Sequence, residues 1–327
     1  MLLAGCANLP QSNTEGCQAI AGIPGPEDLT LDRWSDPPRL IVSSDDRRNP
    51  ANPGKLLAVC LSGGMVTELS RRGEPAGLIL HPHGIDLVQA RDGTLQLYVV
   101  THPHRGEGSE AVIQYRLERD YLVFQRRYSG SHLVSPNDLA ARPDGSFYVC
   151  NDSSARGGML ELILGLRRSS VVYFDGLGTW SVAAERLAMA NSAAIDRDRM
   201  YVSATRANRI YAFRIAEDGR LIERRDLARV RGPDNLTLDG NTLLVAAHVN
   251  TIAFMRHARD PKKRSPSTVY AIALPSGPTT ALFADDGSRI SGASVALRYK
   301  GLLYLGQVFE PFLLKCPVLG AVPRRGG

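Results

Sequence analysis

A six-residue apolar run recurs six times along the 327-residue chain at a nearly constant interval. Each copy is rich in β-forming residues and ends in small or polar ones. The first residues of successive copies lie 57, 50, 53, 43 and 60 positions apart. The copies are LIVSSD (40–45), LYVVTH (97–102), FYVCND (147–152), MYVSAT (200–205), LLVAAH (243–248) and LYLGQV (303–308). A period of this length indicates a repeat architecture.

Strand-like segments and turns fill the intervals between these copies. AVIQYRL, SVVYFDG, RIYAFRI and STVYAIA alternate with Pro-Asp-Gly and Asp-Gly turns. Six units without a regular helical partner predict an all-β fold, a six-bladed β-propeller with a central tunnel. We expect the propeller to occupy residues 17–317 and the ring to close by joining the N- and C-terminal strands. The helix-like segment at 159–169 is interpreted as an insertion between strands.

Composition and charge exclude two classes of protein. No apolar run approaches the roughly 20 residues that span a bilayer, so the mature chain is expected to be soluble. The net charge is +6, but the 39 Lys and Arg residues are spread among 33 acids. The one dense basic cluster, at 256–264, accompanies no recognition motif or row of stacking aromatics. We interpret it as a solvated loop and predict no nucleic-acid partner.

Residues 1–16 and 318–327 are predicted to lie outside the propeller, as a tether and a tail. The sequence Leu3-Ala4-Gly5-Cys6 resembles the lipobox at which bacterial lipoproteins are cleaved and lipidated on cysteine. An export signal needs a basic segment and about 7 to 15 apolar residues upstream. Either the natural start lies further upstream or the match is chance. The first alternative predicts an exported protein: a periplasmic or outer-membrane lipoprotein anchored at Cys6, or a secreted protein.

Two of the five cysteines flank the repeats, two lie within them, and Cys6 lies near the N-terminus. Cys17 precedes the first repeat and Cys316 follows the last. Because a propeller joins its chain ends in one blade, a Cys17–Cys316 disulfide would clamp the ring, and it would point to an oxidising compartment. Cys60 and Cys150 lie within strand patterns, and we expect them to be buried small hydrophobes rather than nucleophiles.

A short polar element precedes each repeated strand at a similar phase. Equivalent positions of a propeller converge at one end of its tunnel, and most of these positions carry carboxylates or amides, the oxygen ligands that suit calcium. One such pair alone is more often a turn or a cap, so the argument depends on the recurrence. The elements are Glu27-Asp28, His83, Asn137-Asp138, Asn191, Asp234-Asn235 and Ser294.

Charge matching predicts two calcium ions, each neutralised by two carboxylates. The expected sets are Glu27 with Asp234, completed by Asn137, Asn191 and Asn235, and Asp28 with Asp138, completed by backbone oxygens. His83 and His102 belong to one repeat, and a neutral imidazole beside the ion could act as a general base while the second one shares its proton. The competing interpretation is that both histidines are structural. His248 is a further residue that could reach the tunnel, whereas His257 is expected at the surface.

The chain resembles the paraoxonase family of calcium-dependent lactonases and arylesterases, as a bacterial member, from Cys17 to Cys316. The matching pieces are PEDL (26–29), PHGI (82–85), VVTHP (99–103), PNDL with FYVCND, LGLRRSSVVYF (164–174), AN (190–191), DN (234–235) and SGASVALRYKG (291–301). The resemblance implies a six-bladed propeller, a catalytic calcium held by Glu27, Asn137, Asn191, Asp234 and Asn235, and a structural calcium held by Asp28, Asp138 and the main-chain oxygen of Ile85. It further implies a catalytic pair, His83 and His102, and a disulfide between the end cysteines.

The sequence also departs from that family at the tunnel mouth. Asp45-Asp46-Arg47-Arg48 replaces an apolar and tyrosyl loop, and Met189 replaces an aromatic residue, so the rim is more charged. We expect no counterpart of the family's apolar N-terminal helix. We therefore do not transfer a substrate preference.

The predicted function is calcium-dependent hydrolysis of lactones and aryl esters, by attack of water on a metal-polarised carbonyl with histidine as general base. Two alternatives stay open. One is a sugar-lactone hydrolase of the gluconolactonase and regucalcin type, and the other is a non-catalytic binding module stabilised by calcium.

Overall fold

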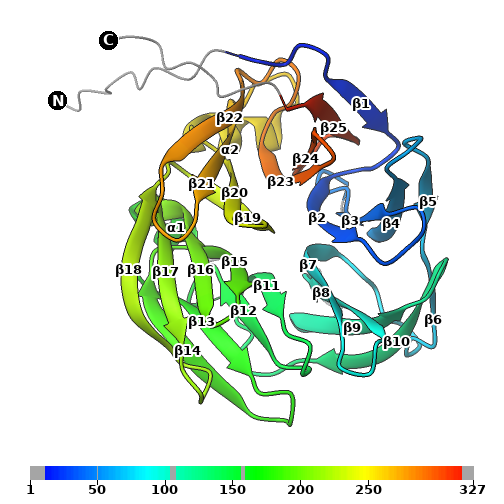
Figure 1. Cartoon of the computed structure of the whole chain (residues 1–327), viewed down its shortest axis with the longest axis vertical. Coiled ribbons are helices and arrows are strands. Elements are labelled where there is room, and N and C mark those ends of the chain that lie inside the picture. The colour runs from blue at the N-terminus through cyan, green and yellow to red at the C-terminus, as the bar shows by residue number, and fades with distance from the viewer. Residues whose placement is uncertain (1–11, 50, 104–107, 156–158, 319–327) are drawn as a thin grey trace.

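The chain folds into a six-bladed β-propeller, which confirms the predicted architecture (Figure 1). The computed structural model describes residues 12–49, 51–103, 108–155 and 159–318. Six separate sheets stand around a central axis, and the first strand of each sheet lies innermost (Figure 1). No helix in these ranges is long and apolar enough to cross a bilayer. The predictions for Cys6 and for the tail beyond residue 318 fall outside the described residues.

Each blade is an antiparallel sheet of four strands, numbered from the tunnel outward. Blades I and II are β2 (Pro26–Asp32), β3 (Arg39–Ser44), β4 (Lys55–Cys60) and β5 (Val66–Glu68), then β7 (Pro82–Gln89), β8 (Leu95–Thr101), β9 (Ala111–Leu117) and β10 (Tyr121–Tyr128). Blades III and IV are β11 (Pro136–Ala141), β12 (Phe147–Asn151), β13 (Ser169–Phe174) and β14 (Trp180–Leu187), then β15 (Ala190–Asp196), β16 (Arg199–Ala204), β17 (Arg209–Ile215) and β18 (Leu221–Arg229). Blades V and VI are β19 (Pro233–Asp239), β20 (Thr242–Ala247), β21 (Ser267–Ala273) and β22 (Thr279–Asp285), then β23 (Ala293–Tyr299), β24 (Leu302–Gln307), β25 (Phe312–Pro317) and β1 (Gln18–Ala21).

The six repeated runs of the sequence form the second strand of each blade, from β3 to β24. The polar elements that precede them lie on the innermost strands, which explains their common phase. Blade II differs from the others because the short strand β6 (Ser70–Arg72) pairs in parallel with β10 and adds a fifth strand.

The ring closes in blade VI, where β1 pairs antiparallel with β25 (Figure 1). The predicted disulfide is present between Cys17 and Cys316, two residues separated by 299 positions in the sequence. A covalent link therefore holds the first and last strands of the propeller together.

The hydrophobic core is a ring of six apolar layers, one between each pair of neighbouring blades. The layer between blades II and III shows the packing: Phe147 of β12 contacts Tyr98, Tyr128 and Phe174, with ring centroids 5.0 to 5.3 Å apart. Because every blade is held by both neighbours, the innermost strands are rigid supports for the side chains that they direct into the tunnel.

In the part of the chain that the structure describes, two α-helices connect second to third strands, and the sequence predicted only one of them. The expected insertion is α1, which is shorter than predicted (Met159–Leu164). The basic segment read as a solvated loop is in part helical, because α2 (Thr251–Arg259) begins at an Asn250 cap and extends into it. A short 3₁₀ turn, Thr205–Ala207, follows β16.

Candidate metal centre and active site

Every innermost strand has an irregular register at its first residues, of the kind that a β-bulge produces. The shifts lie between Pro26 and Asp28, Pro82 and Ile85, Pro136 and Asp138, Ala190 and Ala193, Pro233 and Leu236, and Ala293 and Val295. In a regular strand, successive side chains point to opposite faces. A bulge re-aims one of them, so two consecutive polar side chains can serve the same tunnel.

The predicted catalytic-calcium ligands form a buried set of oxygens that lack partners. Four of these atoms have no hydrogen bond within the described chain: Glu27 Oε2, Asn137 Oδ1, Asn191 Oδ1 and Asn235 Oδ1. All four residues are at most 7% exposed. A buried polar atom without a partner costs about 1 to 3 kcal/mol. Four such oxygens on four innermost strands are the donor set expected for a hard cation.

Electrostatics at this site disfavour the negative charge of Glu27. Burial raises the pKa of Glu27 to about 7, against the opposing effect of the Arg47 guanidinium, while the nearby Asp234 raises it further. Asn235 donates from Nδ2 to Glu27 Oε1 at 3.1 Å, which leaves its own oxygen free. Asp234 Oδ2 lies 2.5 Å from His248 Nε2, so His248 reaches the tunnel.

Asp28 and Asp138 form a second acidic site on the same strands. Burial raises the pKa of both carboxyls well above the ordinary range, and each is further raised by neighbouring carboxylates. Asp28 accepts hydrogen bonds from the N–H groups of Leu29 (2.9 Å) and Ile85 (2.7 Å). Asp138 Oδ2 accepts from the Ser192 hydroxyl and, at 3.4 Å, from the Ala193 N–H. Neither carboxyl pairs with a basic side chain in the described chain.

The backbone around this acid pair is close-packed. A Cβ atom on Gly84 would lie 2.3 Å from Asp138 Oδ1 and 2.8 Å from the Asn137 carbonyl oxygen. Gly84 therefore lets β7 approach the acid pair, and it brings the neighbouring Ile85 beside Asp28.

The residues of both sites fit calcium better than a transition metal, since their donors are carboxylate and amide oxygens. Within the described residues, no group of three His, Cys, Asp or Glu side chains could by itself hold a metal ion. At the Glu27 end, the amide oxygens of the three asparagines would therefore have to complete the donor set. The assignment of each residue as a ligand, including the Ile85 oxygen, stays a prediction.

The two histidines expected to be catalytic lie side by side. The rings of His83 and His102 are perpendicular, with centroids 4.8 Å apart. His83 Nδ1 is 3.3 Å from Glu27 Oε2, and burial, followed by the charge of Arg47, lowers the pKa of His83 well below its usual value. His102 Nδ1 contacts Glu110 Oε2 at 2.7 Å. The four side chains therefore lie next to one another in the order Glu110, His102, His83 and Glu27.

The charged segment Asp45–Arg48 is less exposed than the predicted outer rim of the tunnel. Asp45 is buried and contacts His81 at 3.1 Å. Arg48 donates to Glu310 and to the carbonyl oxygen of His257, both at 2.7 Å. The expectation that His257 lies at the surface is wrong, because this residue is only 1% exposed and fixes α2 to that network.

Cys60 also departs from expectation, whereas Cys150 is buried as predicted. Cys60 lies at the end of β4 and is partly exposed, with its sulfur 3.1 Å from the Ser62 hydroxyl.

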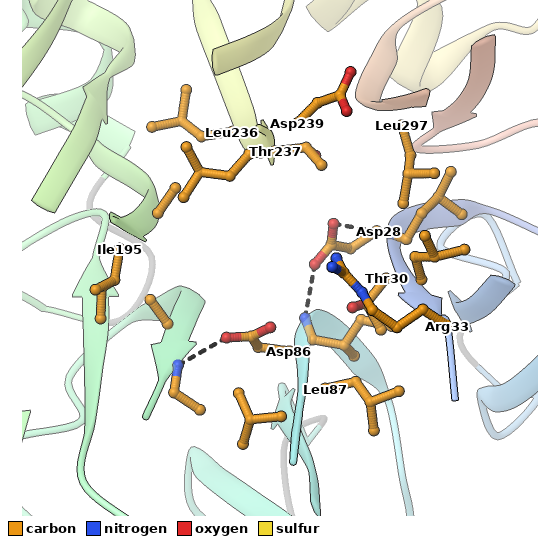
Figure 2. A pocket seen from close by; sticks show the side chains of 18 of the residues that line it. Asp28, Thr30, Arg33, Asp86, Leu87, Ile195, Leu236, Thr237, Asp239 and Leu297 are labelled. Atoms are coloured by element: carbon orange, nitrogen blue, oxygen red, sulfur yellow. Dashed lines mark hydrogen bonds between the residues drawn. The ribbon is translucent and has the colours of Figure 1, made fainter. Parts of the chain in front are cut away.

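A cavity of about 610 Å³ occupies the tunnel on the other side of the acid pair (Figure 2). Asp28 and Asp86 direct their carboxylates into it, and Arg33, Thr237 and Asp239 line it further along (Figure 2). His83, His102 and Glu27 do not line this cavity, so it is separate from the histidine end. Asp86 Oδ2 accepts the Ala141 N–H at 2.8 Å, and burial raises the pKa of Asp86 to about 6.

Sequence reasoning missed three polar residues around the site. Glu110 orients His102 from eight positions downstream, and no local spacing rule indicates such a contact. Ser192 links Asp138 to the Leu236 N–H, which it contacts at 3.0 Å. Asp86 was passed over, although it follows PHGI directly on the same innermost strand.

Comparison with known proteins gives consistent results. A model of the arylesterase family matches residues 46–316. The chain is 29% identical over 273 residues to serum paraoxonase/arylesterase 1 of Rattus norvegicus, covering 80% of this chain and 76% of that protein. It is 26% identical over 286 residues to serum paraoxonase/lactonase 3 of Homo sapiens, covering 85% and 76%. A gluconolactonase of Xanthomonas campestris has the same fold, with a TM-score of 0.60 at 18% identity over 96% of each chain.

Proposed function

The chain belongs to the arylesterase family, and we propose that it hydrolyses lactones and aryl esters at the histidine end of the tunnel, with calcium as cofactor. The curated relatives are paraoxonases, arylesterases and lactonases, and they make this chain a carboxylic ester hydrolase. The observation that carries the proposal is the set of four buried oxygens without hydrogen bonds, on Glu27, Asn137, Asn191 and Asn235, beside the half-buried His83.

The proposed calcium ligands are those predicted from the sequence. Glu27, Asn137, Asn191, Asp234 and Asn235 would hold the ion at the reaction centre, and Asp28, Asp138 and the Ile85 oxygen would hold a second, structural ion. When bound, the first ion would polarise the ester carbonyl and stabilise the negative charge that develops on its oxygen.

His83 is the proposed general base. Its Nδ1 atom is buried without a hydrogen bond and lies beside Glu27 Oε2. Because burial and Arg47 lower the pKa of His83, the ring is neutral at pH 7 and can take a proton from a water molecule at Nδ1.

His102 and Glu110 support that base. The contact with Glu110 Oε2 favours the proton on His102 Nδ1, which leaves Nε2 as an acceptor. The rings of His83 and His102 have centroids 4.8 Å apart, so we assign His102 to receive the proton after His83. Asn137 and Asn191 would orient the carbonyl oxygen of the substrate.

The test is hydrolysis of γ- and δ-lactones, gluconolactone and phenyl acetate, with calcium and after chelation, together with counting of bound calcium per chain. We expect calcium-dependent turnover and two ions. His83→Gln should lower kcat at least a hundredfold with an unchanged melting temperature. His132→Gln, at a half-buried histidine stacked on Trp180 away from the tunnel, is the matched control. Turnover of gluconolactone alone, with one ion, would favour the sugar-lactone alternative. A folded, calcium-binding protein without any turnover would favour the non-catalytic module.

The predictions of export and of a lipid at Cys6 concern residues outside the described ranges. They remain a proposal, to which the Cys17–Cys316 disulfide adds support by favouring an oxidising compartment.

A further inference from the structure

Arg47 contacts the backbone where the innermost strands of blades I and II begin, next to the proposed reaction centre. Its Nη1 donates to the carbonyl oxygens of Gly25 at 3.4 Å and Asp45 at 3.5 Å, and its Nη2 donates to that of Pro82 at 3.4 Å. Gly25 precedes Glu27 by two residues, and Pro82 immediately precedes His83. The guanidinium group is therefore held beside both the proposed ligand and the proposed base.

The guanidinium has no acidic partner within the described residues, although acids surround it in the sequence. Asp45 is engaged with His81, Glu110 with His102, and Glu310 with Arg48. The side chain of Asp46 forms no ion pair with Arg47 at 4 Å or less. The three hydrogen bonds of Arg47 are long and hence weak. Arg47 is partly exposed, so a ligand can reach its donors.

The positive charge of Arg47 acts at the reaction centre. It has the largest effect of any charged group on the pKa of both Glu27 and His83, and it lowers both values. If a divalent cation is balanced by Glu27 and Asp234, the charge of the guanidinium is left without a counter-charge nearby. A substrate that supplies a carboxylate at this point would provide it.

We propose that Arg47 is an anion subsite and that the preferred substrates are lactones or esters with a free carboxylate near the reacting ester group. The planar fork of N–H donors in Arg matches a carboxylate in two parallel hydrogen bonds. The inference deepens the proposed function and rests on it, because the subsite is defined relative to that reaction centre.

The test compares two substrates that differ only in charge: γ-butyrolactone-γ-carboxylate and the corresponding carboxamide. The ratio of their kcat/KM values is measured by pH-stat in calcium, for the wild type and for Arg47→Gln and Arg47→Lys. A charge-assisted bidentate contact predicts a wild-type ratio of at least about ten, which falls about ten- to a hundredfold in Arg47→Gln. Arg47→Lys should keep part of the preference for the carboxylate substrate. The control is Arg91→Gln, the same charge change at a side chain 80% exposed between β7 and β8, which should leave the ratio unchanged.

Binding is measured separately, by calorimetry with the ring-opened product 2-hydroxyglutarate. Weaker binding to Arg47→Gln than to Arg91→Gln is expected. A wild-type ratio near one, or a ratio unaffected by Arg47→Gln, would overturn the subsite. If no lactone or phenyl acetate is turned over by the folded, calcium-loaded protein, the proposed function fails instead. Calorimetry then decides the subsite alone: equal binding by the two variants would refute it.

Discussion

Replacing Asp138 by Asn should change the stability of the propeller in opposite directions without and with calcium. Burial raises the pKa of this carboxyl well above the unfolded value, so its charge destabilises the folded state at neutral pH. Asn keeps the shape, and its Oδ1 can still accept from the Ser192 hydroxyl and the Ala193 N–H. In chelator, the variant should therefore melt above the wild type. Because a carboxyl with a raised pKa destabilises only above its unfolded pKa, this advantage should vanish below about pH 4.

Calcium binding should raise the melting temperature of the propeller by several degrees for each ion. A ligand at a thousandfold excess over its Kd stabilises the native state by about 4 kcal/mol. Unfolding entropy of about 2.1 cal/mol/K per residue, over roughly 300 residues, gives about 0.6 kcal/mol per kelvin. Each ion should then raise the melting temperature by about 6 °C. Asp138→Asn should lose the increment of the structural ion and retain that of the other.

The assay is calorimetric melting in chelator and in millimolar calcium, with Asp86→Asn as the matched control. Asp86 is another tunnel acid with a raised pKa, and it is not an assigned ligand. The control should also melt higher in chelator but keep the full calcium shift. Asp138→Asn with the full shift, or with a lower melting temperature than the wild type in chelator, would refute the two-carboxylate site.

Three further predictions follow from individual contacts. Glu110→Gln should lower kcat about tenfold with little change in KM, because His102 loses a charged partner at 2.7 Å; an unchanged pH–kcat profile would contradict this role. Serine at both Cys17 and Cys316 should lower stability by at most about 6 kcal/mol, since the link joins residues 299 positions apart; reduction of the wild type should reproduce the loss, and equal melting temperatures would contradict it. In chelator, Asp86→Asn should gain urea resistance over the wild type as pH rises from about 4 to above 6, because the folded pKa of Asp86 is raised to about 6; a gain independent of pH would contradict the assignment.

The architecture could be predicted because an apolar strand motif recurs at a nearly constant interval along the sequence. The repeated runs mark the second strand of every blade, and a polar element at constant phase marks the innermost strand. The Cys17–Cys316 link followed from ring closure, which brings the chain ends into one blade. These inferences depend only on the order of elements, not on the packing of any particular side chain.

The errors concern features that tertiary packing decides. His257 belongs to a polar, basic segment, yet it is buried because Arg48 and Glu310 bind it from other blades. The helix α2 had a local signal that was overlooked, since Asn250 caps it by accepting the Ala253 N–H at 3.0 Å. Cys60 has an apolar neighbourhood in sequence, but it ends a strand and is partly exposed.

The bulges explain why a simple alternation rule would have concealed the site. Strict alternation would turn either Glu27 or Asp28, and either Asn137 or Asp138, away from the tunnel. Both members of each pair are buried, and the register shifts at these residues. The first member of each pair then belongs to the proposed reaction centre and the second to the inner acid pair. On β2 and β11, the consecutive polar residues therefore coincide with a bulge and supply both proposed layers. A single regular strand could supply only one of these layers.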